Sequence, residues 1–153
     1  MLSVERSFGL TRTAKKFNVL TARNENVRKS KCFCTSIETL IFSCAGGSNV
    51  GQIANQAAIE LTKMGHGKIY CLAGIGGHVS HLIESTKIAK KIVAIEGCPV
   101  QCSKKVLEHT GFGVDIYGVV TEMEVKKNYD LSVDPDDVKK VVDKVSSEIL
   151  KAR

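Results

Sequence analysis

The sequence predicts a doubly wound α/β domain, in which helices cover both faces of a mainly parallel sheet. Short apolar runs alternate along the chain with amphipathic helical patterns, and turns rich in glycine or polar residues separate them. The chain has 153 residues, which is enough for one domain with a hydrophobic core. We therefore expect a three-layer domain, Rossmann-like or flavodoxin-like, with about four strands.

The first half of this pattern holds two strands and two helices. The run TLIFSC, residues 39–44, predicts the first strand. A helix follows, with Ser48 or Asn49 as its N-cap and Gly65 as its terminator. The run KIYCLAG, residues 68–74, predicts the second strand, and residues 75–91 predict the second helix. The apolar face of the first helix consists of Val50, Ala54, Ala57, Leu61 and Met64.

The second half repeats the alternation. The run IVAIEG, residues 92–97, predicts the third strand. Pro99 suits the first position of a helix, which makes Cys98 its N-cap and Gly111 its end. The run VDIYGVV, residues 114–120, predicts the fourth strand, and a final helix starts at Asp134. Four strands are few for such a sheet, so an edge strand from the N-terminal extension and pairing in a homo-oligomer both stay open.

Residues 1–31 form a basic N-terminal extension that carries the whole net charge of +6. It holds eight basic and two acidic residues, which leaves fourteen of each sign in residues 32–153. We expect the extension to be poorly ordered and residues 32–153 to form the single α/β domain. We expect a cytoplasmic protein. The alternatives for the extension are that it directs import into an organelle or that it is an electrostatic docking arm.

The charge pattern also bears on partners. In the neutral part of the chain no basic cluster is interleaved with aromatic residues, so we expect no nucleic-acid partner. The sequence has no apolar run near the roughly 18 residues that a membrane span needs, so we expect no membrane partner.

Four cysteines lie at or after the ends of predicted strands. Cys44 ends the first strand, and Cys71 lies near the end of the second. Cys98 and Cys102 follow the third. Ligands of open parallel sheets bind at the carboxyl ends of the strands. If these strands are neighbours, three chain segments bring four sulfurs to one edge of the sheet, and without a secretory signal we expect thiols there rather than disulfides.

Cys98 and Cys102 lie four residues apart, so a single helix would point them the same way. Cys98 at a helix start would face the positive end of the helix dipole, which favours thiolate. Four thiolates suit a tetrahedral Zn²⁺ ion, and an iron–sulfur cluster would use the same four. The alternative is a thiol redox or sulfur-transfer enzyme with Cys98 as nucleophile and Cys102 as resolving thiol, which leaves Cys44 and Cys71 without a role. Cys71 lies inside an apolar run, so for this cysteine we expect a buried position in the core as the alternative to a role in the site.

The blocks FSCAGGSNVGQIANQAAIELTKMGHGKIYCLAGIGGHVS and IVAIEGCPVQCSKKVLEHTGFGVDIYGVVTEM resemble the DGC domain family, over about residues 40–145. Residues Glu96 to Cys98 stand at the motif that names the family, with glutamate in place of aspartate. The resemblance implies that Cys44, Cys71, Cys98 and Cys102 are the family's cysteines, which are thought to bind zinc. If four thiolates bind, the site is closed and serves structure or metal storage; three thiolates and a water leave a position for catalysis or for a substrate thiol.

A glycine-rich loop offers a further alternative. Gly74, Gly76 and Gly77 follow a predicted strand as in a dinucleotide-binding fingerprint, but Val79 stands where the last glycine or alanine belongs. The loop after Cys44 lacks the lysine of a P-loop. Both loops can still hold a small anion with backbone N–H groups, and otherwise their glycines serve tight turns.

Other polar residues fall near the same edge. His78 and His81 can supply a ligand, a hydrogen bond to a ligand or a general base. Glu96 and Glu122 lie at strand ends, where we expect solvated carboxylates rather than groups that orient a ligand. Cys32 and Cys34 lie two residues apart and can form a second metal site, a lid or a transfer arm, or be surface thiols. Whether the protein is an enzyme does not follow from these residues.

Overall fold

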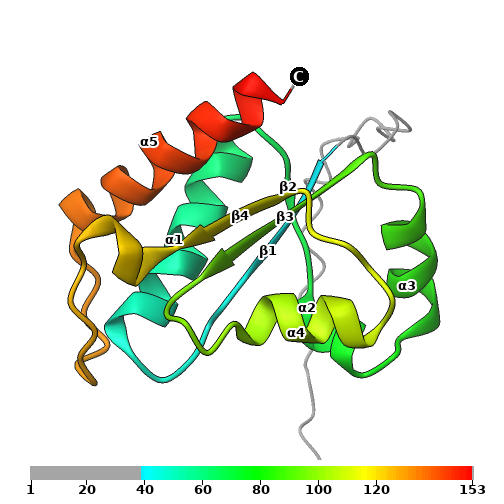
Figure 1. The fold of residues 1–153 in the computed structure, drawn as a ribbon, viewed down its shortest axis with the longest axis horizontal. Helices are drawn as coiled ribbons and strands as arrows, with labels where there is room; N and C mark the ends of the chain where they lie inside the picture. Colours follow the sequence, from blue (N-terminus) through cyan, green and yellow to red (C-terminus); the bar gives the residue numbers. More distant parts are fainter. Residues whose placement is uncertain (1–38, 153) are drawn as a thin grey trace, which may run out of the picture. The chain divides into compact units, whose positions relative to one another are not determined.

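The computed structural model describes residues 39–152, which belong to one compact unit of the chain. Their four strands form a parallel sheet in the order β2-β1-β3-β4, and helices cover both of its faces (Figure 1). The predicted doubly wound α/β fold is therefore confirmed. The elements are β1 Thr39–Ser43, α1 Asn49–Lys63, β2 Lys68–Ile69, α2 Leu72–Gly76, α3 Ser80–Lys87, β3 Lys91–Glu96, α4 Cys102–His109, β4 Ile116–Val119, the 3₁₀ helix η1 Val120–Met123 and α5 Pro135–Lys151.

The two faces of the sheet have separate apolar cores. On one face Ile41 and Val93 pack with α1 and α5, and on the other Leu40 and Phe42 pack with residues of α2 and α4. Successive side chains of a strand point to opposite faces, so each of the central strands β1 and β3 contributes to both cores. Burial on both faces explains why these strands read as continuous apolar runs rather than as an alternating pattern.

The second strand and the second helix differ from the prediction. Strand β2 ends at Ile69, and residues from Leu72 to Gly76 form α2 instead of completing the strand. The predicted helix over residues 75–91 is divided into α2 and α3 by a turn at His78, whose φ is 54°. As an edge strand, β2 pairs on one side alone, so local capping contacts compete more easily with its ladder.

Helix ends follow the predicted chemistry more closely. Ser48 occupies the N-cap position of α1 as predicted, although its side chain makes no capping hydrogen bond. Gly65 follows the end of α1 with a φ of 79°, a conformation that glycine adopts without strain. Helix α5 begins with Pro135 after Asp134, whose Oδ1 accepts a hydrogen bond of 2.9 Å from Asp136 N. None of the helices within residues 39–152 is long and apolar enough to span a bilayer. Residues 1–31, Cys32 and Cys34 lie outside the described residues, so the predictions made for them, and for the domain boundary, stay predictions.

Candidate thiol site

The strand order reverses between β1 and β3, and we call the region outside the carboxyl ends of these two strands the switch-point crevice. From β1 the chain passes through α1 to β2 on one side, and from β2 it crosses to β3 on the other side of β1. Helices α1 and α4, which follow β1 and β3, consequently cover opposite faces of the sheet (Figure 1). At such a switch point an open α/β sheet binds its ligands, outside the carboxyl ends of the strands.

Two of the predicted site cysteines lie at this crevice. Cys44 follows β1 directly and its backbone N–H donates to Ile95 O of β3 at 2.9 Å. Cys98 lies two residues beyond the end of β3. Both residues are half-buried and pack against the core on the α1 side. The condition set by the sequence, that the cysteine-bearing strands be neighbours, is thus met by β2, β1 and β3.

Glycines allow the backbone segments around the crevice to approach one another closely. A Cβ on Gly51, in the first turn of α1, would lie 2.8 Å from both N and O of Gly46. A Cβ on Gly97, just after β3, would lie 2.9 Å from Gly51 N. Real Cβ atoms do not approach backbone that closely, so these glycines bring the loop after β1, the start of α1 and the end of β3 together.

Cys98 and Cys102 do not share a helical face, contrary to the prediction. Residues 98–101 form a turn in which Gln101 N donates to Cys98 O at 3.2 Å, and Gln101 has a φ of 61°. Helix α4 therefore starts at Cys102, and Cys98 is not its N-cap. Pro99 occupies the second position of this turn, which suits proline as well as the start of a helix does. The helix dipole that we expected at Cys98 acts at Cys102 instead.

Glu96 is buried rather than solvated, which corrects the expectation for this carboxylate. Its side chain is 1% exposed, and Oε1 accepts a hydrogen bond of 2.7 Å from Lys104 N. The carboxylate thereby satisfies one of the free N–H groups in the first turn of α4, where negative charge is favourable. Glu122, in η1, is exposed as expected.

The thiol of Cys102 experiences the other groups of the crevice. Partial burial of the sulfur raises the pKa of Cys102 above its ordinary value, and negative charge on Cys44, Glu96 and Cys98 raises this pKa further. Lys105 acts in the opposite direction. The residue as a whole is still exposed to solvent. The structure therefore brings Cys44, Cys98 and Cys102 close enough to interact electrostatically, whereas their convergence with Cys71 on one metal ion stays a prediction.

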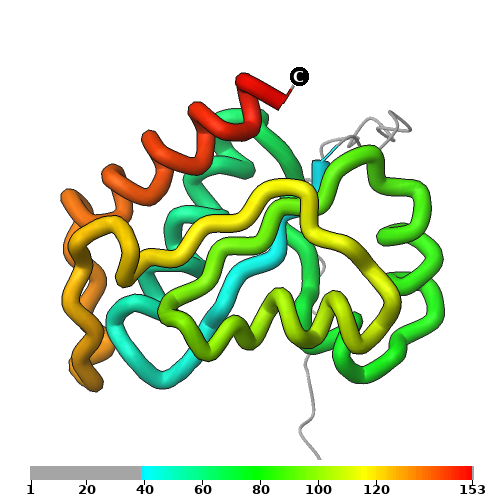
Figure 2. Tube along the Cα trace, in the orientation of Figure 1, coloured from blue at the N-terminus to red at the C-terminus, as the bar shows by residue number. Residues whose placement is uncertain are grey.

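Lys127 and Asn49 belong to the same crevice, although the sequence pattern did not single out either side chain for it. Lys127 Nζ donates to Cys98 Sγ at 3.4 Å, across 29 residues of sequence. Asn49, the first residue of α1, holds the backbone on both sides of Lys127 through its carboxamide. In Figure 2 the loop after β1, in cyan, lies between the turn after β3 and the orange segment that follows η1. No local spacing rule links residue 127 to either partner.

Cys71 lies two residues beyond the edge strand β2 and is exposed, so the core position suggested by its apolar run is wrong. Its Sγ accepts a hydrogen bond of 3.3 Å from Gly74 N, which makes Cys71 the N-cap of α2. Gly74 and Gly76 lie inside this short helix, where a Cβ on Gly74 would collide with Leu82. Gly74 thus allows close helix packing, and because both glycines lie within α2 they do not form the loop of a dinucleotide fingerprint.

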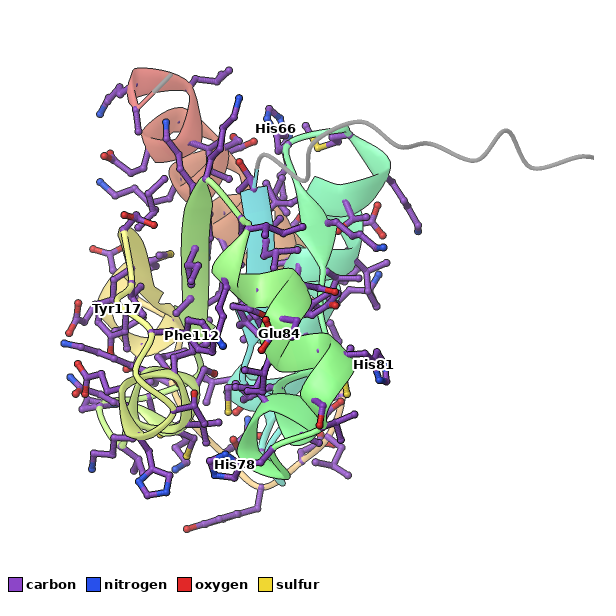
Figure 3. The ribbon with its side chains drawn as sticks, turned by 90° about the vertical axis from the view of Figure 1, so that its right-hand side faces the viewer. His66, His78, His81, Glu84, Phe112 and Tyr117 are labelled. Carbon is purple, nitrogen blue, oxygen red and sulfur yellow. The ribbon has the colours of Figure 1, made fainter. Side chains whose placement is uncertain are left out.

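The histidines are distributed over both ends of the domain. Figure 3 shows His66 at one end and His78 at the other, with His81 on α3. The rings of His78 and His109 meet edge to face with their centroids 6.0 Å apart. Within residues 39–152, no three His, Cys, Asp or Glu side chains are placed so that they could hold one metal ion together. The thiols thus fit zinc in chemical type, but they do not form a preassembled metal cage.

The fold and the site define an α/β domain that carries thiols in the crevice at its switch point. The chain belongs to the DGC domain family, whose family model matches residues 40–145. AnvM, described as the anaerobic and virulence modulator of Pseudomonas aeruginosa, is 30% identical over 102 residues, which cover 67% of this chain and 78% of that protein. No solved structure matches the chain.

Proposed function

We propose that the protein binds a zinc ion through the thiolates of Cys44, Cys71, Cys98 and Cys102. One observation carries the proposal: Cys44 and Cys98 follow the adjoining ends of β1 and β3, where Cys44 N bonds to Ile95 O, and Cys102 lies close enough for their charge to raise its pKa. A bound cation would offset the negative charges that raise the pKa of Cys102. Thiolates prefer soft or borderline metals such as Zn²⁺. Zinc would supply a fixed positive charge that holds these thiols in their anionic form.

Metal binding on this proposal is coupled to a local rearrangement. Within the described residues the cysteines form no group of three ready ligands, and Cys71 Sγ is engaged with Gly74 N. Zinc affinity therefore includes the free energy of bringing the thiols together, as in other domains that order around their metal. The relative's description names a modulator rather than a reaction. We accordingly propose a metal-binding role and assign no catalytic step.

Metal analysis of the full chain, purified without oxygen, tests this proposal. We expect one zinc per chain and four thiols that react with a thiol reagent after chelation but not before it. Serine at Cys44, Cys98 or Cys102 should remove zinc. Cys71→Ser distinguishes two kinds of site. Loss of zinc indicates a site with four thiolates, and retention of zinc indicates a site with three. The control replaces Cys32 and Cys34 together and should leave one zinc bound, whereas metal-free wild type under these conditions would contradict the proposal.

Thiol exchange at Cys98 is the second candidate function. The observation in its favour is the ammonium of Lys127, which lies 3.4 Å from Cys98 Sγ. Cys102 would then be the resolving thiol. Its pKa is raised above the ordinary thiol value, so at neutral pH it is seldom ionised and is poorly suited to the first attack on a disulfide. A metal-free protein with a reversible disulfide between Cys98 and Cys102 favours this function over zinc binding. Brown protein with visible absorption would instead indicate an iron–sulfur cluster.

A further inference from the structure

A backbone segment after η1 is clamped to the start of α1 by one buried side chain. Asn49 is 7% exposed, and its Nδ2 donates to Lys126 O at 2.9 Å. Its Oδ1 accepts from Asn128 N at 2.8 Å, and its backbone N–H donates to Asn128 O at 3.2 Å. The carboxamide therefore uses its donor and its acceptor on the two residues that flank Lys127, which fixes the backbone of Lys127 from both sides.

The clamp determines where the Lys127 side chain can reach. Its Nζ lies 3.4 Å from Cys98 Sγ, and Lys127 is itself exposed to solvent. Cys98 is half-buried, so a molecule that approaches its sulfur from solvent meets a positive charge beside it. A second cation, Lys105, acts on the neighbouring thiol of Cys102. Each of these two thiols thus has a lysine close to it.

We propose that Lys127 is a specificity-determining residue that selects small, negatively charged disulfides at Cys98, and that Asn49 is its positioning residue. The inference deepens the second candidate function, thiol exchange at Cys98, and rests on it. Two unit charges about 4 Å apart in water attract enough to favour an anionic compound over a neutral one by roughly fivefold per charge. Salt weakens this preference, because the charges are exposed.

Disulfide exchange with two reagents of different charge tests the selectivity in the full chain after chelation. The reagents are 5,5′-dithiobis(2-nitrobenzoate), a dianion, and 4,4′-dithiodipyridine, which is neutral. The Cys98 thiolate attacks one reagent sulfur, a mixed disulfide forms at Cys98, and the other aromatic thiolate leaves with the electron pair of the broken bond. Peptide mass spectrometry follows Cys98 by itself. The ratio of the two rates is the readout, because both rates contain the same fraction of ionised Cys98.

We expect Lys127→Met to lower the ratio of dianion to neutral rates by up to about fivefold at low salt, while Lys127→Arg keeps it. Asn49→Ala should lower the ratio in the same direction although Lys127 is still present. In the wild type the ratio should fall between 0.01 M and 1 M salt, as the Debye length shrinks from about 30 to 3 Å. The matched control is Lys126→Met, which removes an exposed neighbouring charge and should change the ratio less.

Equal rate changes for both reagents in Lys127→Met would overturn the inference, and so would a ratio that salt does not alter. Lys127 is exposed, so this variant is expected to fold, and circular dichroism checks Asn49→Ala. If Asn49→Ala is unfolded, the Lys127 variants still decide the selectivity. Zinc content is measured separately, so a protein without zinc contradicts the proposed metal function and leaves this ratio unaffected.

Discussion

Replacement of Gly51 by alanine tests the close backbone contacts that build the thiol crevice. Gly51 lies in the first turn of α1, where alanine is intrinsically favoured over glycine by about 1 kcal/mol. The new Cβ would, however, lie 2.8 Å from two backbone atoms of Gly46, which cannot rotate away as a side chain would. Overpacking of this kind costs about 1–3 kcal/mol. We expect a net loss of about 1 kcal/mol in the free energy of unfolding.

Urea denaturation followed by circular dichroism measures this loss. With a slope of about 2 kcal/mol per molar urea, the midpoint should fall by about 0.5 M. The control is Gly47→Ala in the adjoining loop, where an added Cβ has no atom within 4 Å and φ is not in the left-handed region. This control should raise stability by about 0.4–1 kcal/mol, because alanine restricts the unfolded chain. A Gly51→Ala protein as stable as the wild type, or more stable, would refute the packing argument.

Three further predictions concern single side chains. The pKa of Cys102 is raised in the folded state, so ionisation of this thiol costs more in the folded than in the unfolded protein. The free energy of unfolding is therefore fully retained below the ordinary thiol pKa of 9.0 and falls as the pH rises through the folded value. Cys102→Ser removes this ionisation and should flatten the fall in urea midpoint between pH 8 and pH 10. Glu96→Leu should lower the free energy of unfolding by about 1–3 kcal/mol, because Lys104 N loses its acceptor. Glu96→Gln should lower it less and should also lower the pKa of Cys102. Equal urea midpoints for the wild type and both variants would exclude the capping role. Asp134→Ala should cost about 1 kcal/mol in thermal denaturation through loss of the cap on α5, whereas Asp134→Asn should be close to wild type.

The elements with strong local signals were predictable from the sequence. Helix α5 combines a capping aspartate, a proline at its first position and a valine stripe that becomes its buried face, so local and tertiary preferences agree. Strands β1 and β3 are central and buried on both faces, which made them continuous apolar runs. The failures lie where two local solutions have similar energy. The segment from Tyr70 to Gly76 could continue an edge strand or cap a helix through Cys71, and Pro99 suits a turn and a helix start equally.

The fold class and the thiol-bearing segments could be predicted from the sequence, because hydrophobic period and residue type are local properties. The placement of Cys44 and Cys98 at one crevice followed from the rule that parallel strands end at the same edge, once β1 and β3 proved to be neighbours. The charges that surround the thiols, in contrast, depend on tertiary contacts. Lys127 reaches Cys98 because Asn49, 78 residues earlier in the chain, holds its backbone. Contacts between segments so distant depend on how the helices pack on the sheet, which no local pattern encodes.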